Sequence, residues 1–388
     1  MADWINKLTN LFGKGLDTRH LPAGFFTYQS PVDQVPPFRL HLRLESNGSG
    51  LLIINAHTTL HLNQTAAEFL YSFIQGTPPA EIAEQMSKRY HVTPQQALED
   101  YQDLLDKINL LSTTQDIDPV EYLGIDQTEA YPADLSAPYR LDCALTYRTS
   151  DQERDTTPTG RVKRELLTAE WKIVLDKAWR AGIPHVLFTG GEPTTRPDLD
   201  ELLTYAQSLG MVTGLLTDGL RLTAHNYLHD LLQRGLDHIM ILLDDRNNRS
   251  WEAVRDVIAE DIFLTVHLTV DSKNSKRSQE ILQRLQQMGV QNISLTAATQ
   301  AETKAVKDLA SMAAASGIKL VWDVPVPYSS FNPFQLERED KHLTDGAGKG
   351  WLYVEPDGDV LPAQGIASVM GNLLTDEWAA VWKNRPAA

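Results

Sequence analysis

Apolar and polar residues alternate in two stretches near the start of the chain, at 38–44 and 51–62, on either side of Asn47-Gly48-Ser49-Gly50. Alternation with a period of two predicts strands, and the glycine-rich segment between them predicts a β-hairpin. Helical spacing follows, and it predicts three helices: one capped by Asn63, one after Pro78-Pro79, and one begun by the capping box at Thr93. A hairpin followed by three helices over 38–111 is the outline of a winged helix.

Strand and helix patterns alternate from residue 140 to about 325. Strands are expected at 141–147, 185–189, 212–217, 238–243, 263–270, 292–296 and 319–324. Amphipathic helices are expected between them, for example at 167–179, 199–209, 226–234, 278–288 and 303–315. This regular alternation predicts a parallel sheet, most simply a partial or full (β/α) barrel, in which ligands bind at the carboxyl ends of the strands.

Three segments flank these two domains. Within 1–37, apolar residues at helical spacing predict a short amphipathic helix; they are Trp4, Ile5, Leu8, Leu11 and Phe12. This helix is expected to fold back on its own protein, with a membrane surface or a partner as alternatives. Segment 112–137 is acidic and proline-punctuated, which is typical of a linker. Within 326–388, Pro356-Asp357-Gly358 between apolar stretches predicts a second hairpin.

Composition narrows the function classes. The chain has 388 residues, and its 51 acids against 35 bases give a net charge of −16, which disfavours nucleic-acid binding. The winged-helix outline is acidic too, with seven acids and three bases between 58 and 112, so a DNA-binding role is the weakest expectation. The single cysteine, Cys143, excludes an intramolecular disulfide and a cysteine-ligated zinc site or cluster. No apolar run approaches the ~20 residues of a transmembrane helix and no signal peptide is visible, so a cytoplasmic location is expected.

The most informative segment is 185–193, where a short apolar strand opens into Gly190-Gly191-Glu192-Pro193. Two glycines let a backbone approach a ligand closely, and a carboxylate beside them can hold an ammonium group. The segment resembles the S-adenosylmethionine-binding strand of radical SAM enzymes. The resemblance implies that Gly190, Gly191 and Glu192 face the methionyl amino group. It also places Asp218, in Thr217-Asp218-Gly219, where the family usually has asparagine.

The same resemblance indicates that the cysteines of the cluster motif are missing from this chain. Radical SAM enzymes carry CxxxCxxC after their first barrel strand, and here those three positions are Thr149, Glu153 and Thr156. A [4Fe–4S] cluster is held by thiolates, so no cluster, no catalytic residue and no radical SAM activity of its own are expected. S-adenosylmethionine is expected to bind weakly at most, because the cluster that chelates it is missing and Asp218 adds charge near its carboxylate.

Two further resemblances extend this picture. Residues 50–55, 62–67 and Leu104-Leu105 are similar to the small D protein of pyrroloquinoline quinone biosynthesis, a peptide-recognition family. That resemblance implies a leader peptide that adds as a strand to the exposed sheet edge and packs on the last helix. Residues 351–363 and 371–374 resemble the SPASM-type tail of peptide-modifying radical SAM enzymes, but Ala363 stands where those relatives have a cysteine.

The resulting prediction is an α/β protein: a partial TIM-like barrel of radical SAM type at 138–325, a winged-helix-like, PqqD-like domain at 38–111, and a SPASM-like hairpin extension at 326–388. Its predicted role is to bind a precursor peptide, an active radical SAM enzyme or another maturation protein, or both kinds of partner. The main alternative is a cluster-independent enzyme, with or without S-adenosylmethionine, at an acidic barrel mouth formed by Glu192, Asp218, Asp244 and Asp323. A winged-helix regulator is the weaker alternative. His225 and His229 share a predicted helix but lack a third ligand, so no metal site is expected.

Overall fold

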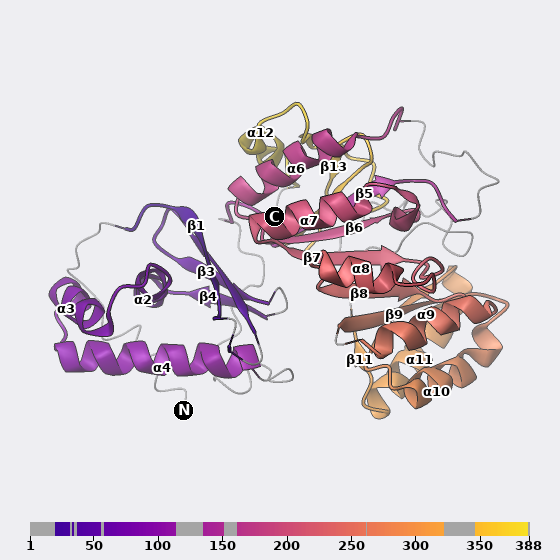
Figure 1. Cartoon of the computed structure of the whole chain (residues 1–388), viewed down its shortest axis with the longest axis horizontal. Helices are drawn as coiled ribbons and strands as arrows, with labels where there is room; N and C mark the ends of the chain where they lie inside the picture. The colour runs from indigo at the N-terminus through magenta and orange to yellow at the C-terminus, as the bar shows by residue number, and fades with distance from the viewer. Residues whose placement is uncertain are drawn as a thin grey trace. The chain divides into compact units, whose positions relative to one another are not determined.

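The structure is a computed structural model, and it describes residues 20–31, 33–34, 37–55, 58–113, 135–150, 161–260, 262–321 and 346–386. The chain divides into two compact units, residues 1–136 and 137–388 (Figure 1). The expected N-terminal helix, most of the linker, and the positions Glu153, Thr156 and Asp323 lie outside the described residues. No helix in the described ranges is long and apolar enough to cross a membrane.

The first unit contains a four-stranded antiparallel sheet in the order β1-β2-β3-β4. Its strands are Gly24–Gln29, Arg39–Leu44, Gly50–Ile54 and Thr58–Leu62. The hairpin was predicted, but the long second stretch is two strands because the chain turns at Asn55, whose φ is 50°. Asparagine adopts this left-handed conformation more readily than most residues. Strand β1 was not predicted, and it pairs along the whole of β2.

Three helices follow the sheet, as predicted: α2 (Gln64–Ile74), α3 (Pro79–Tyr90) and α4 (Pro94–Thr113). Asn63 caps α2 by accepting a hydrogen bond from the backbone N–H of Ala66 at 2.9 Å. The inner face of the sheet and the helices α2 and α4 enclose one apolar core, which includes Leu42, Leu52, Leu70, Ile108 and Leu111.

The second unit is built on a ten-stranded sheet in the order β11-β10-β9-β8-β7-β6-β5-β12-β13-β14. Its parallel strands are Arg140–Thr146, His185–Gly190, Val212–Thr217, His238–Leu242, Phe263–Val270, Asn292–Ala297 and Lys319–Leu320, from β5 to β11. The helices between them are Thr168–Arg180, Leu199–Leu209, Tyr227–Gln233, Asn248–Ile258, Ser278–Met288 and Thr303–Ala315, from α6 to α11. Because β5 and β11 do not pair within the described residues, this is the expected partial barrel.

The C-terminal hairpin also forms as predicted, from β12 (Trp351–Val354) and β13 (Asp359–Leu361), with the two-residue strand β14 (Gly371–Asn372) beside them. Strand β12 pairs in parallel with β5, so the hairpin continues the barrel sheet. A short helix, α12 (Trp378–Lys383), ends the described part of the chain. Since β5, β6 and β7 all run in the same direction, their carboxyl ends meet at one edge of the sheet, where the candidate residues lie.

Candidate functional site

The two glycines after β6 lie directly against the end of β5. The backbone N–H of Gly191 donates to the carbonyl oxygen of Thr146 at 2.8 Å, and that of Glu192 donates to the carbonyl oxygen of Arg148 at 2.7 Å. A Cβ atom at Gly190 would lie 2.1 Å from the Thr146 oxygen, and one at Gly191 would lie 2.1 Å from the Arg148 oxygen. The glycines are therefore required by a close approach between two strand ends of this chain.

The carboxylate of Glu192 is buried, with 2% of the residue exposed, and it joins the ends of β6 and β7. Its Oε1 accepts from the backbone N–H and the hydroxyl of Thr194, at 2.9 and 2.6 Å. Its Oε2 accepts from the backbone N–H of Asp218 at 2.7 Å. The hydroxyl of Thr217 lies 2.8 Å from Oε1 and 2.9 Å from Oε2. Four donors thus surround a group that offers about four lone-pair sites.

Burial raises the pKa of Glu192 to about 8, and the negative charge of Asp218 adds to this rise. The hydrogen bonds from Thr194 and Asp218 act in the opposite direction but do not offset it. Burial therefore favours the protonated form of Glu192, in which its O–H donates to the hydroxyl of Thr194 or Thr217 instead of accepting from it.

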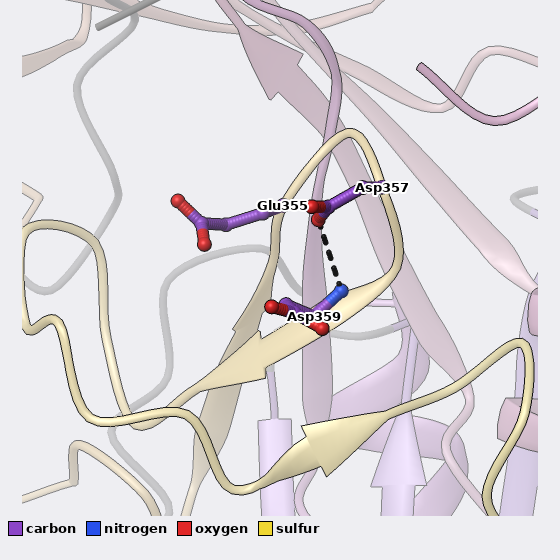
Figure 2. Close-up of side chains that lie close together, drawn as sticks. All are labelled: Glu355, Asp357 and Asp359. Atoms are coloured by element: carbon purple, nitrogen blue, oxygen red, sulfur yellow. Dashed lines mark hydrogen bonds between the residues drawn. The ribbon is translucent and has the colours of Figure 1, made fainter. Parts of the chain in front are cut away.

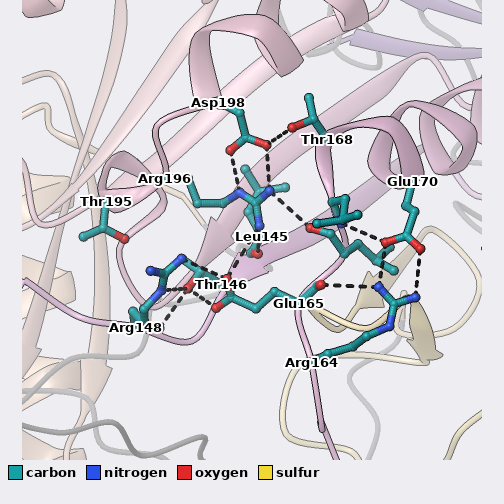
Figure 3. Close-up of polar contacts among 12 residues, drawn as sticks. Leu145, Thr146, Arg148, Arg164, Glu165, Thr168, Glu170, Thr195, Arg196 and Asp198 are labelled. Atoms are coloured by element: carbon teal, nitrogen blue, oxygen red, sulfur yellow. Dashed lines mark hydrogen bonds and ion pairs between the residues drawn. The ribbon is translucent and has the colours of Figure 1, made fainter.

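An ion-pair network lies beside the carboxyl end of β5 (Figure 3). Arg148 contacts Glu165 at 3.0 Å, and the hydroxyl of Thr146 donates to the same carboxylate. Arg196 is buried and binds both carboxylate oxygens of Asp198, at 2.9 and 2.7 Å. The Arg196 guanidinium also donates to the backbone carbonyl oxygens of residues 145 and 166, so it fastens the end of β5 to the start of α6.

The residues at the cluster positions do not fit a [4Fe–4S] cluster. Thr149 is half-buried beyond the end of β5, and a hydroxyl does not replace a thiolate. Cys143 lies inside β5, where burial raises the pKa of its thiol well above the ordinary value and keeps it protonated. The chain holds no other cysteine, so it cannot supply three thiolates.

Three of the four acids of the predicted barrel mouth lie among the described residues. Glu192 and Asp218 are adjacent, whereas Asp244 does not join them in a group of three ligand atoms within 4.8 Å. The one such group in the described ranges lies on the C-terminal hairpin and consists of Glu355, Asp357 and Asp359 (Figure 2). The prediction for His225 and His229 needs a correction, because α8 begins at residue 227 and only His229 lies on it.

Glu355, which sequence reasoning missed, ties the hairpin to the barrel. Its side chain is 1% exposed, and Arg161 binds both of its oxygens, at 2.6 and 3.0 Å. The hydroxyl of Tyr147, next to the end of β5, donates to the same carboxylate at 3.0 Å. The only sequence signal was the acidic residue before the Pro-Asp-Gly turn, because its two partners lie about two hundred residues away, at separations of 208 and 194.

Replacing Glu355 with glutamine is expected to destabilise the second unit by about 2 kcal/mol, because it removes the buried carboxylate that binds Arg161 and accepts from Tyr147. This expected loss of stability is smaller than that for a fully buried ion pair, because the Arg161 side chain is one-third exposed. Urea unfolding of the full chain measures the loss. Glu201→Gln is the control, because Glu201 forms a 2.6 Å ion pair with Lys172 but is 57% exposed. Equal midpoints for the two variants would contradict the expected role of Glu355.

Both units of the chain are similar to known proteins. Residues 143–310 match the family described as the radical SAM superfamily, and residues 50–109 match coenzyme PQQ synthesis protein D (PqqD). The chain is 29% identical over 264 residues to the PqqA peptide cyclase of Streptomyces rochei, covering 58% of this chain and 70% of that protein. It is 26% identical over 278 residues to the PqqA peptide cyclase of Methylocella silvestris, covering 64% and 73%.

Among solved structures, the fold is similar to that of SuiB from Streptococcus suis. The structure of SuiB bound to the precursor peptide SuiA gives a TM-score of 0.57 at 15% identity and covers 88% of this chain and 86% of that chain. The structure of SuiB bound to S-adenosylmethionine gives 0.55 at 15% identity, covering 92% and 88%. The fold class predicted from the sequence is therefore confirmed, and this chain combines a radical SAM-type domain with a PqqD-like domain that precedes it.

Proposed function

We propose that this chain binds a precursor peptide through its first unit and serves peptide maturation without radical chemistry of its own. The observation that carries the proposal is the pairing of a PqqD-like domain with a radical SAM-type barrel that has one buried cysteine. The relatives are peptide cyclases, and a protein of similar fold has been seen with its precursor peptide. Chemistry on the peptide then needs a second protein that supplies the cluster.

The sheet of the first unit offers an edge for such a peptide. Strand β4 ends the sheet order and pairs only with β3 in the described part of the chain, whereas β1 forms the opposite edge. Leu60 and Leu62 of β4 lie in the same apolar core as Ile108 and Leu111 of α4. An extended peptide added to β4 would therefore gain backbone hydrogen bonds from the strand and apolar contact beside α4.

Calorimetric titration of the full chain with precursor peptides encoded near its gene tests this proposal. We expect a dissociation constant below ~100 μM, the range in which a modest strand-addition interface is measurable. A peptide whose alternate backbone amides are N-methylated should lose at least tenfold in affinity for one of the two methylation registers. The other register is the matched control, because an edge strand bonds only alternate residues of its partner.

A pair of proline variants locates the edge. Thr59→Pro alters the exposed middle of β4, and Thr27→Pro alters the exposed middle of β1 on the opposite edge. Proline lacks the N–H donor and its ring obstructs an incoming strand. Only Thr59→Pro should weaken binding, with circular dichroism confirming that both variants keep their folds. If no encoded peptide binds, or if Thr27→Pro alone removes binding, the proposed edge is wrong.

A further inference from the structure

We propose that segment 190–192 joins the ends of neighbouring strands in this chain. In this proposal Glu192 hydrogen-bonds to the end of β7 and does not bind the amino group of S-adenosylmethionine. This inference stands apart from peptide binding by the first unit. It assigns a structural use to residues that the fold family uses for a cofactor. Three observations support this proposal. They are the filled acceptor sites of Glu192, the burial of its carboxyl group, and the backbone contacts of the two glycines.

The acceptor sites of Glu192 are already filled. The Thr194 backbone N–H and hydroxyl, the Thr217 hydroxyl and the Asp218 backbone N–H all lie within 2.9 Å of its oxygens. An incoming ammonium group would have to displace one of these donors. Each displaced donor would remain in a buried site without a partner, which makes the exchange unfavourable.

Burial also makes Glu192 a weaker partner for an ammonium group, because it favours the uncharged carboxyl form. Asp218 raises the pKa of Glu192 and is itself held in place by the backbone N–H of Leu220, which donates to its Oδ1 at 2.9 Å. Arg221, the nearby cation, donates to the carbonyl oxygen of Thr194 and stacks on Tyr227 with 4.7 Å to the ring centroid. A protonated carboxyl group gives an ammonium ion no opposite charge to pair with.

On the side where a side chain would lie, the two glycines contact the chain's own backbone. Gly191 donates to the Thr146 carbonyl, and the space where a Cβ of Gly190 or Gly191 would lie is filled by backbone oxygens of the segment after β5. In this chain, the close approach that glycine permits is made by the protein's own backbone. Because the acceptor sites of Glu192 are filled by the chain's own donors, they do not fit the amino group of S-adenosylmethionine.

Calorimetric titration of the full chain with S-adenosylmethionine is the first test. We expect no saturable heat and no rise in melting temperature with up to ~1 mM S-adenosylmethionine. Binding with a dissociation constant well below this concentration would stabilise the folded chain and raise its melting temperature. Micromolar binding that Glu192→Gln abolishes would overturn the inference. This test involves no peptide, so its outcome is independent of the proposed function.

The pH dependence of stability is the second test, and it needs no cofactor. The folded-state pKa of Glu192, about 8, lies above its ordinary value of 4.5, so its favourable contribution is complete below pH 4.5 and is lost as pH rises through 8. Glutamine does not titrate. The melting temperature of Glu192→Gln should therefore rise relative to wild type between pH 5 and 9, whereas exposed Glu201→Gln should follow wild type. A constant difference across this range would contradict a buried, protonated Glu192.

Discussion

Gly190→Ala is expected to prevent the barrel unit from folding stably, with a loss of more than about 4 kcal/mol, the range in which single substitutions become exceptional. Gly190 has a φ of +125°, and its added Cβ would lie 2.1 Å from the backbone oxygen of Thr146. That oxygen belongs to β5, a strand buried between β6 and β12, so it cannot move aside without breaking the sheet. Denaturant unfolding followed by circular dichroism measures the loss.

Gly289→Ala is the matched control. Gly289 ends α10 with a φ of +91°, but no atom lies within 4 Å of where its Cβ would be. Its substitution carries only the conformational penalty of an L-residue in the left-handed region, about 1 kcal/mol. If both alanine variants unfold at the same denaturant concentration, the close approach of β5 and β6 does not constrain the fold as described.

The second large effect concerns iron. The chain, expressed anaerobically with iron and sulfide, is expected to be colourless and to hold no stoichiometric iron. The reason is that the chain has one cysteine, and its resemblance to radical SAM enzymes places Thr149, Glu153, Thr156 and Ala363 at the positions of cluster ligands. A [4Fe–4S] cluster would give roughly four irons per chain and a broad absorbance near about 400 nm. An active relative, such as a PqqA peptide cyclase reconstituted in parallel, is the positive control.

Much of the fold could be predicted from local patterns. Period-two alternation located the hairpin strands, and the capping residues Asn63 and Thr93 located the starts of two helices. The parallel pairing of β12 with β5 could not be predicted, because it joins residues about 210 positions apart and depends on which sheet edge is left open. Strand β1 was also missed, whereas the turn at Asn55 had a residue type that favours it.

The site was predicted in part. Sequence reasoning identified 190–192 and Asp218 as neighbours at the barrel mouth, and the structure brings Glu192 and Asp218 into hydrogen-bonding contact. It predicted a charge effect of Asp218 on a cofactor carboxylate, whereas the structure places that charge beside Glu192 and raises its pKa. The sequence could not predict that the hydrogen-bond acceptor sites of Glu192 are filled. The motif does not reveal that the hydroxyls of Thr194 and Thr217 point toward its carboxyl oxygens.

The single cysteine and the PqqD-like domain together lead to one expectation for the whole chain: it holds a peptide but does not change it. A precursor peptide that binds in the calorimetric titration is therefore incubated anaerobically with the reconstituted chain, S-adenosylmethionine and a strong reductant. Its intact mass is then measured by mass spectrometry. The account predicts an unchanged peptide mass and uncleaved S-adenosylmethionine, with modification appearing only when an active radical SAM enzyme is added. A modified peptide produced by this chain alone would contradict the account.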